Sequence, residues 1–282
     1  EVMSLFQNTS ALGIKPEDIG GTKLGALGIP EFGTDFAMQM LMDTKPQYFS
    51  DLVRIAGLAH GTDVWLGNAQ TLIKEGKATI STAICTRDDI MIYLIQKGLD
   101  SEESFKIMEM VRKGKVASGK CKEWPEWKQD MIDHGVPDWY IWSCERIKYM
   151  FPKAHAAAYV MMAWRVAYCK VFYPLAYYTA YFSIRATAFD YEKMAMSPVR
   201  LEHYIAEYKA KKAEGTISNT EEDELGVMRI VQEMHARGYE FTPIDIYKAK
   251  ARTFQIIDGK IMPSFKVISK VGEVAGESIE IA

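Results

Sequence analysis

The sequence contains few cysteines, and none of them forms a metal-binding or disulfide pattern. Four occur in 282 residues, without a CxxC pair: Cys85, Cys121, Cys144 and Cys169. This spacing excludes a zinc ribbon and a disulfide-stabilised secreted domain. The N-terminus also lacks the basic segment and apolar core of a signal peptide. We therefore expect a cytoplasmic protein.

A membrane-spanning segment is absent too. The most apolar stretch, about residues 154–184, is interrupted by Arg165, Lys170 and Pro174, which a bilayer helix rarely tolerates together. It should instead lie in a protein core or an internal groove. The formal charge of −3 excludes a uniformly basic, histone-like coat. Because the chain begins without methionine, we expect a piece of a longer protein.

Motifs for hydrolysis or phosphoryl transfer are missing. There is no Ser/His/Asp grouping, no Walker loop and no carboxylate pair among apolar residues. His60 and Asp63 could be two metal ligands, but no third ligand follows at a suitable spacing. We therefore expect no catalytic residue and no metal site in this chain.

Acidic residues are absent from one long central segment. Between Arg146 and Ala188 there is no Asp or Glu, although 37 of the 282 residues are acidic. Surface helices usually mix charges to form i,i+4 pairs, so this pattern predicts a negative partner from outside the segment. The cations of the segment are Arg146, Lys148, Lys153, Arg165, Lys170 and Arg185.

Lys153, His155 and Tyr159 lie close together where a helix over 154–171 is predicted to begin. At about 100° per residue, His155 and Tyr159 share one helix face. The free N–H groups of a helix start, with Lys153 and His155 beside them, would suit a phosphate, and Tyr159 could stack on a base. The pattern also fits a His–Tyr pair at the edge of a core and a solvated lysine.

Other cations mark the ends of predicted helices. Arg112, Lys113 and Lys115 close one helix, where they could simply compensate the helix dipole. Arg87 begins another helix, where the dipole disfavours a cation and an anionic ligand would explain it. With the tryptophans of residues 124–142, these cations also fit a nucleic-acid groove.

Helix signals dominate and predict a mainly α fold. Thr86 and a capping box of Asp100 with Glu103 predict two helix starts, and Gly98 and Gly114 predict their stops. Other helices are expected at about 50–57, 125–134, 138–149, 154–171, 174–185, 198–214 and 220–237. Asp258-Gly259 predicts the turn of a small β-hairpin, and the first 30 residues are expected to be irregular.

Six segments carry a recognisable pattern: "GALGIPEFGT" (25–34), "LVRIAGLAHGTDVWLGNAQ" (52–70), "RDDIMIYLI" (87–95), "FKIMEMVRKGK" (105–115), "VPDWYI" (136–141) and the run from "IKYMFPKAHAAAY" to "SIRA" (147–186). Together they closely resemble the C-family replicative DNA polymerases of the PolC type, the polymerase III alpha subunit of low-GC Gram-positive bacteria. The similarity runs over nearly all of the chain and is densest from 25 to 186.

The resemblance implies a fingers domain over 1–186, an outer helical extension over 187–250, and a hairpin with the start of a helix-hairpin-helix DNA-binding element over 251–282. In this family the fingers close over the incoming deoxynucleoside triphosphate (dNTP). The implied nucleotide-binding residues are Lys153, His155, Tyr159, Arg87, Arg112, Lys113, Lys115 and, as a lesser candidate, His60.

The resemblance also implies that the whole protein is a DNA-directed DNA polymerase. Its palm aspartates would hold Mg²⁺ outside this chain, so this piece should bind nucleotide without polymerising it. The implied partners are dNTP, primer-template DNA, the palm and thumb domains, and a sliding clamp bound through other regions.

Two stretches depart from the family pattern. Residues 116–135 form a longer segment than is usual, and Lys270 and Val271 replace the first two residues of a Gly-Leu-Gly, leaving Gly272. Two competing classes stay open. One is a non-catalytic helical module for single-stranded nucleic acid, and the other is a structural protein whose cations meet an acidic partner.

Overall fold

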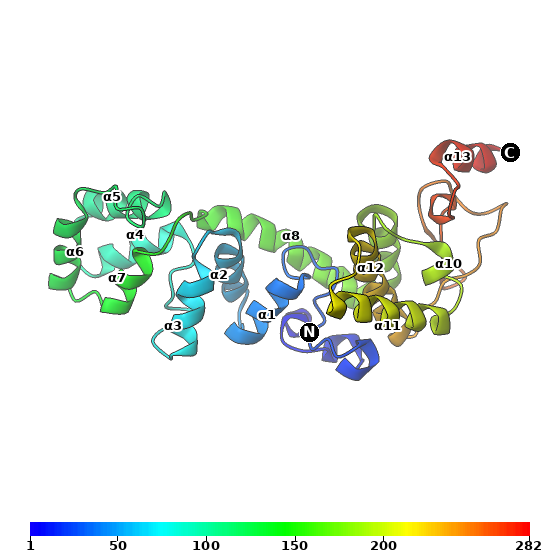
Figure 1. The fold of residues 1–282 in the computed structure, drawn as a ribbon, viewed down its shortest axis with the longest axis horizontal. Helices are drawn as coiled ribbons and strands as arrows, with labels where there is room; N and C mark the ends of the chain where they lie inside the picture. The colour runs from blue at the N-terminus through cyan, green and yellow to red at the C-terminus, as the bar shows by residue number, and fades with distance from the viewer. The chain divides into compact units, whose positions relative to one another are not determined.

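The computed structural model describes residues 1–282 and confirms a mainly helical fold (Figure 1). The only sheet is the antiparallel pair of β1 (Gln255–Ile257) and β2 (Lys260–Met262). No helix is both long and apolar enough to cross a membrane. The helices are α1 Asp35–Thr44, α2 Phe49–His60, α3 Gln70–Lys74, α4 Arg87–Gln96, α5 Ser101–Arg112, α6 Trp124–Asp133, α7 Asp138–Cys144, α8 Lys153–Phe172, α9 Pro174–Ala180, α10 Tyr191–Met194, α11 Pro198–Glu214, α12 Asn219–Ala236 and α13 Glu273–Ile281.

The chain divides into two compact units. One is Pro30–Trp164, here called the central unit, and the other combines Glu1–Ile29 with Arg165–Ala282 and is called the terminal unit. Helix α8 contributes its first residues to the central unit and its last residues to the terminal unit. The functional limits expected at residues 186 and 250 stay a prediction.

A carboxylate caps α4 in the central unit. Thr86 is the N-cap residue, as predicted, but its hydroxyl has no hydrogen-bond partner. The Asp89 carboxylate instead accepts from the backbone N–H groups of Thr86, at 2.9 Å, and Cys85, at 3.1 Å. The helix stops before Gly98, whose φ of 98° favours glycine. The predicted boundaries of α4 are therefore correct, but Asp89 makes the capping hydrogen bonds in place of the Thr86 hydroxyl.

Only half of the capping box predicted for α5 forms. Asp100 accepts from the N–H groups of Glu102 and Glu103, at 2.9 and 3.0 Å. The other half of the prediction is wrong, because the Glu103 side chain hydrogen-bonds Asp130 of α6. That bond, partial burial and nearby carboxylates raise the pKa of Glu103 from 4.5 to about 7. The first turn of α5 is thus tied to α6.

Three helices of the central unit differ from expectation, and one of them is the short α3, which was not predicted. Helix α7 ends at Cys144 instead of near residue 149, because residues 148–151 leave the helix and bond to other segments. Helix α1 has no counterpart among the predicted helices. The Thr34 hydroxyl caps it by accepting from the Ala37 N–H at 3.1 Å.

Helix α8 is buried along a face of small residues. We predicted that the apolar stretch of about residues 154–184 lies in a core, and within α8 this is true only of the face of small residues. Tyr159 and Met162 are 46% and 55% exposed, so the face that continues from His155 is accessible. Small side chains let neighbouring segments approach the helix closely and leave its larger apolar side chains outside. The buried positions are Ala156, Val160, Ala163 and Ala167.

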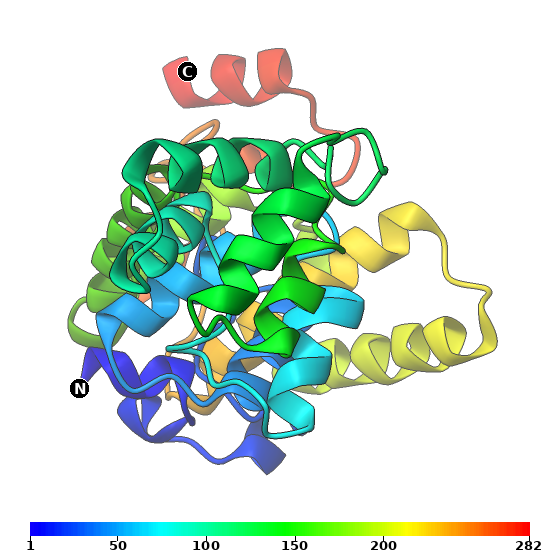
Figure 2. The same cartoon turned by 90° about the vertical axis from the view of Figure 1, so that its left-hand side faces the viewer.

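Helices α11 and α12 form a pair in the terminal unit (Figure 2). Ser197 and Ser218 cap their starts, each hydroxyl accepting a backbone N–H at 3.1 Å. Helix α12 also contacts the helical turn Pro16–Ile19. The N-terminal residues, expected to be irregular, form three short 3₁₀ turns within this unit.

A fully buried lysine joins three segments of the terminal unit. The Lys170 ammonium, with 0% exposure, donates to the backbone oxygens of Gly25 and Leu27, each at 2.7 Å. It also pairs with the buried Glu233 carboxylate of α12 at 2.8 Å, and that carboxylate accepts from the Tyr178 hydroxyl at 2.7 Å. Burial lowers the pKa of Lys170, while Glu233 opposes the shift. Lys170 is therefore not available to an outside anion.

The predicted hairpin is confirmed. Asp258 and Gly259, with φ of 51° and 76°, form its two-residue turn. Farther on, Lys270 has a φ of 68° two residues before Gly272, the N-cap of α13, at a position where the resembled family has glycine. A lysine is strained in this conformation, so the replacement changes the local energetics without removing the turn.

Candidate functional site

The segment 148–151 is the centre of the candidate site in the central unit. Its backbone bonds to three other segments. The Lys148 N–H donates to the Thr62 oxygen at 3.1 Å, the Met150 N–H to Arg112 at 3.2 Å, and the Phe151 oxygen accepts from the Arg87 N–H at 3.1 Å. The loop after α2, the start of α4 and the end of α5 therefore meet immediately before α8.

Gly114 allows the end of α5 to approach this segment. Its φ is +70°, and a Cβ at this position would lie 2.5 Å from the backbone oxygen of Lys148. Gly119 has a nearly identical φ of +71° but nothing within 4 Å of a Cβ. The positive φ favours glycine at both positions, but only at Gly114 would a side chain also collide with the backbone of another segment.

We therefore expect Gly114→Ala to destabilise the protein more than Gly119→Ala. Each change costs about 1–2 kcal/mol because alanine is strained at positive φ. Gly114→Ala must in addition displace the Lys148 backbone, which typically costs about 1–3 kcal/mol more. Chemical unfolding of both variants measures the difference. Equal losses of stability would mean that the 148–151 segment can yield.

A buried amide anchors the loop after α2. Asn68 donates to the backbone oxygens of Asp63, at 2.9 Å, and Ser143, at 3.2 Å, and its own oxygen accepts from the Ser143 hydroxyl at 2.5 Å. On the surface, Lys148 pairs with Asp63 at 2.7 Å. One cation of the acid-free segment thus finds its carboxylate inside the chain.

An aromatic cluster lies at the first turns of α8. The His155 ring stacks on Phe151, with centroids 5.0 Å apart and an interplanar angle of 28°, and lies 4.6 Å from Tyr159. The His60 ring lies 6.2 Å from both His155 and Tyr159. The predicted residues His155, Tyr159 and His60 are therefore neighbours, and half-exposed Tyr159 gives the cluster an accessible aromatic face.

Glu31 holds His60 in this cluster. The His60 Nε2 contacts the Glu31 carboxylate. Glu31 itself has a φ of 71°, which a non-glycine residue rarely adopts. Such strain persists where surrounding contacts fix it, often at functional sites. His60 is thus oriented by a carboxylate that we did not select from the sequence.

Arg87 is a cation without a partner in the chain. Its Nε is buried and has no hydrogen bond. Because its backbone bonds to Phe151, the residue lies next to the start of α8. A buried guanidinium nitrogen that lacks an acceptor is costly unless an outside group supplies one.

Lys153 is exposed, and no carboxylate pairs with its ammonium. Its backbone N–H donates to the Asp88 carboxylate at 2.6 Å. The expectation of a wholly free helix start is therefore wrong for this N–H, because α4 supplies an anion to it. The lysine side chain itself stays available.

The remaining predicted cations divide into paired and unpaired ones. The Arg112 guanidinium donates to Glu109 at 2.5 and 2.9 Å, and Lys113 pairs with the same carboxylate at 3.0 Å. These bonds lower the pKa of Glu109 to about 2. Lys115 is exposed and unpaired. The backbone of Arg112 therefore contacts the 148–151 segment, but Glu109 already compensates the charge of its guanidinium.

The chain contains no cluster of three or more His, Cys, Asp or Glu side chains that could hold a metal ion. His60 is engaged by Glu31, and Asp63 by Lys148. What the site offers is two unpaired cations, Arg87 and Lys153, beside an accessible aromatic cluster.

Comparisons with known proteins agree with the resemblance seen in the sequence. Residues 1–135 match the sequence profile of the bacterial DNA polymerase III alpha subunit finger domain. The chain is 50% identical over 281 residues to the PolC-type DNA polymerase III of Streptococcus suis, which covers 100% of the chain. It belongs to this polymerase family. The same protein of Bacillus subtilis is 50% identical over 279 residues, and that of Caldanaerobacter subterraneus is 48% identical over 279 residues.

The chain spans 19% of the length of these PolC-type relatives. Its residues 1–135 are the part that matches the finger domain. The sequence reasoning missed Phe151, Glu31 and Asp88 as parts of the site. Phe151 lies two residues before Lys153 in "IKYMFPKAHAAAY", and its place in this run could have indicated it. Nothing local could have indicated Glu31, whose partner is 29 residues away.

Proposed function

We propose that this segment binds the triphosphate and base of the incoming dNTP within a replicative DNA polymerase. The main support is that Arg87, whose Nε has no partner, and the exposed Lys153 both lie at the start of α8. His155 and Tyr159 lie beside them. Two cations suit the phosphates, and an accessible aromatic face suits a base or sugar.

The segment acts by positioning and charge neutralisation. Arg87 and Lys153 would offset negative charge on the phosphoryl groups and hold them for in-line attack by the primer. Its own residues do not fit a metal ion, so catalytic Mg²⁺ and its carboxylates belong to other parts of the polymerase. Primer-template DNA, the palm and thumb domains and a sliding clamp complete the proposed assembly.

The test uses Lys153→Ala and His155→Ala in the intact polymerase. Loss of one charge-assisted contact costs about 1.5 kcal/mol, so each variant should lower kcat/KM for nucleotide by about tenfold. Primer-template affinity should change little, because the side chains face the nucleotide. Single-nucleotide incorporation kinetics and DNA binding measure the two quantities separately.

A parallel loss of nucleotide use and DNA affinity would contradict this assignment. It would instead favour a groove for single-stranded nucleic acid. Unchanged kinetics would also contradict it, since the site would then be only structural. Lys212→Ala is a suitable control, because Lys212 is exposed on α11 in the terminal unit and pairs with Glu222 at 2.9 Å.

A further inference from the structure

Glu31 occupies a turn position whose backbone conformation is unfavourable for glutamate. Residues 30–32 form a turn in which Pro30 is followed by Glu31 with a φ of +71°. Positions of positive φ in turns are normally taken by glycine, asparagine or aspartate. A longer side chain is strained there, because its Cβ comes too close to the following carbonyl oxygen. The turn by itself therefore does not explain a glutamate at this position.

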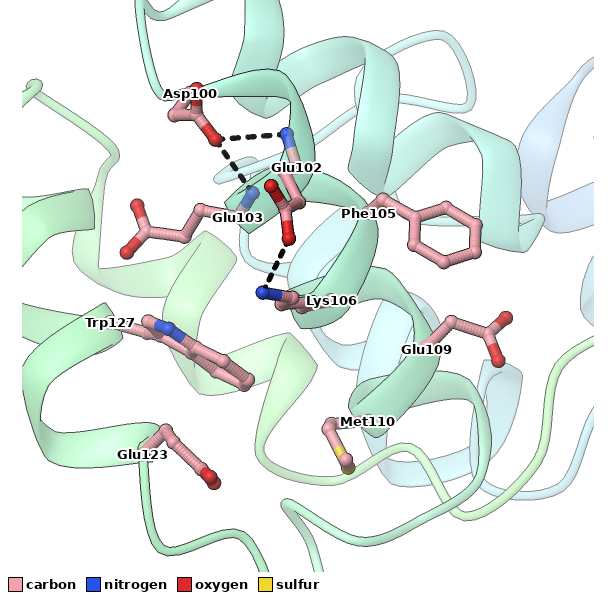
Figure 3. A pocket seen from close by; sticks show the side chains of 9 residues that line it. All are labelled: Asp100, Glu102, Glu103, Phe105, Lys106, Glu109, Met110, Glu123 and Trp127. Carbon is pink, nitrogen blue, oxygen red and sulfur yellow. Dashed lines mark hydrogen bonds and ion pairs between the residues drawn. The ribbon is translucent and has the colours of Figure 1, made fainter.

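The contact made by the Glu31 side chain does explain it. Its carboxylate contacts Nε2 of His60, which is 29 positions away, and the two side chains are 18% and 31% exposed. Carboxylates at the start of α5 have local partners instead: Asp100 caps the helix backbone, and Glu102 pairs with Lys106 one turn on (Figure 3). Glu31 thus links the segment before α1 to the end of α2.

The ring of His60 depends on this link for its orientation. His60 is the last residue of α2, and its ring meets Phe151 edge-on, with centroids 5.6 Å apart. It meets His155 at an interplanar angle of 89°. Ring contacts of this kind do not distinguish the two nitrogens, whereas a hydrogen bond does. Because a carboxylate only accepts, the neutral ring carries its proton on Nε2. Glu31 therefore selects both the tautomer and the orientation of the ring.

We propose that Glu31 is a positioning residue of the nucleotide site. It holds the His60 ring against the aromatic cluster at the start of α8, so that the face that receives the base is formed before the nucleotide binds. This inference rests on the proposed function. A side chain that is already ordered loses less entropy when the ligand binds. Backbone strain that is kept for such a purpose is typical of ligand-binding sites.

Glu31→Gly in the intact polymerase is the main test, because it removes the carboxylate and relieves the positive φ in one change. The Kd of a correctly paired dNTP, measured by single-turnover incorporation, should rise about five- to tenfold. The melting temperature should stay equal or rise. A glutamate that only supports the fold would give the opposite result, a lower melting temperature with a normal Kd.

Lys45→Gly is the matched control. Lys45 is exposed at the C-terminal end of α1 and also has a positive φ, of 48°. Glycine relieves the same kind of strain there, so the melting temperature should again stay equal or rise. Because Lys45 is not one of the site residues, the Kd of the dNTP should change by less than twofold.

Two further variants test whether Glu31 acts through His60. Glu31→Gln keeps the side-chain length and an oxygen that can accept from Nε2, so the Kd should stay within about threefold of the wild-type value. His60→Ala should raise the Kd about as much as Glu31→Gly does. Combining His60→Ala with Glu31→Gly should have no further effect, since the group to be positioned is already gone.

Four results would overturn the proposal. The first is an unchanged Kd in Glu31→Gly. If His155→Ala still impairs nucleotide use, this result leaves the proposed function intact, and if it does not, the proposed function fails as well. The second is an equal rise of the Kd in Lys45→Gly. The third is additive losses when Glu31→Gly and His60→Ala are combined. The fourth is an equal loss in Glu31→Gln, which would show that Glu31 contributes charge and not orientation.

Discussion

Replacing Lys170 with methionine should lower the free energy of unfolding by about 3–5 kcal/mol, because it leaves a buried charge without its partner. The Glu233 carboxylate would keep only the Tyr178 hydroxyl among its present donors. The backbone oxygens of Gly25 and Leu27 would lose their bonds to the ammonium. Urea unfolding followed by circular dichroism measures the loss.

Two control variants make this prediction specific. Lys212 also pairs with a glutamate, Glu222, but both side chains are about half exposed. Lys212→Met should therefore cost less than about 1 kcal/mol. Combining Lys170→Met with Glu233→Leu should recover part of the loss, since the buried carboxylate is then gone. If the Lys170 and Lys212 variants had similar stabilities, the buried pair would not be what holds the Gly25–Leu27 segment.

Arg87→Ala should have the largest effect on nucleotide use. If the guanidinium makes two charge-assisted hydrogen bonds to phosphate, each of about 1.5 kcal/mol, kcat/KM should fall by about 100-fold. The effect should exceed that of Arg112→Ala, because Glu109 already compensates Arg112 through two hydrogen bonds. Single-nucleotide incorporation by the intact polymerase measures both variants.

The thermal stability of each Arg87 variant separates binding from folding. The Nε of Arg87 has no partner in the protein, so removing the side chain breaks no internal hydrogen bond. We expect an unchanged or slightly higher melting temperature together with the kinetic loss. A strongly lowered melting temperature with normal nucleotide kinetics would show instead that Arg87 supports the fold.

Local signals were sufficient for much of the secondary structure. The hairpin turn at Asp258-Gly259 and the end of α4 at Gly98 depend on backbone conformations that a few residues determine. The start of α5 was also placed correctly, through Asp100. The end of α7 was not, because the segment after Cys144 is held by bonds to distant segments that no local pattern encodes.

Sequence patterns alone were enough to predict the mainly helical fold and the polymerase family. They also grouped Lys153, His155 and Tyr159, since a helix brings residues four apart onto one face. Which charges stay available to a ligand depends on the tertiary fold. It pairs Lys148 with Asp63, buries Lys170 against Glu233, and leaves the Nε of Arg87 without a partner. The reason is physical: charge pairing depends on distance in space, and folding sets the distances between residues far apart in the chain.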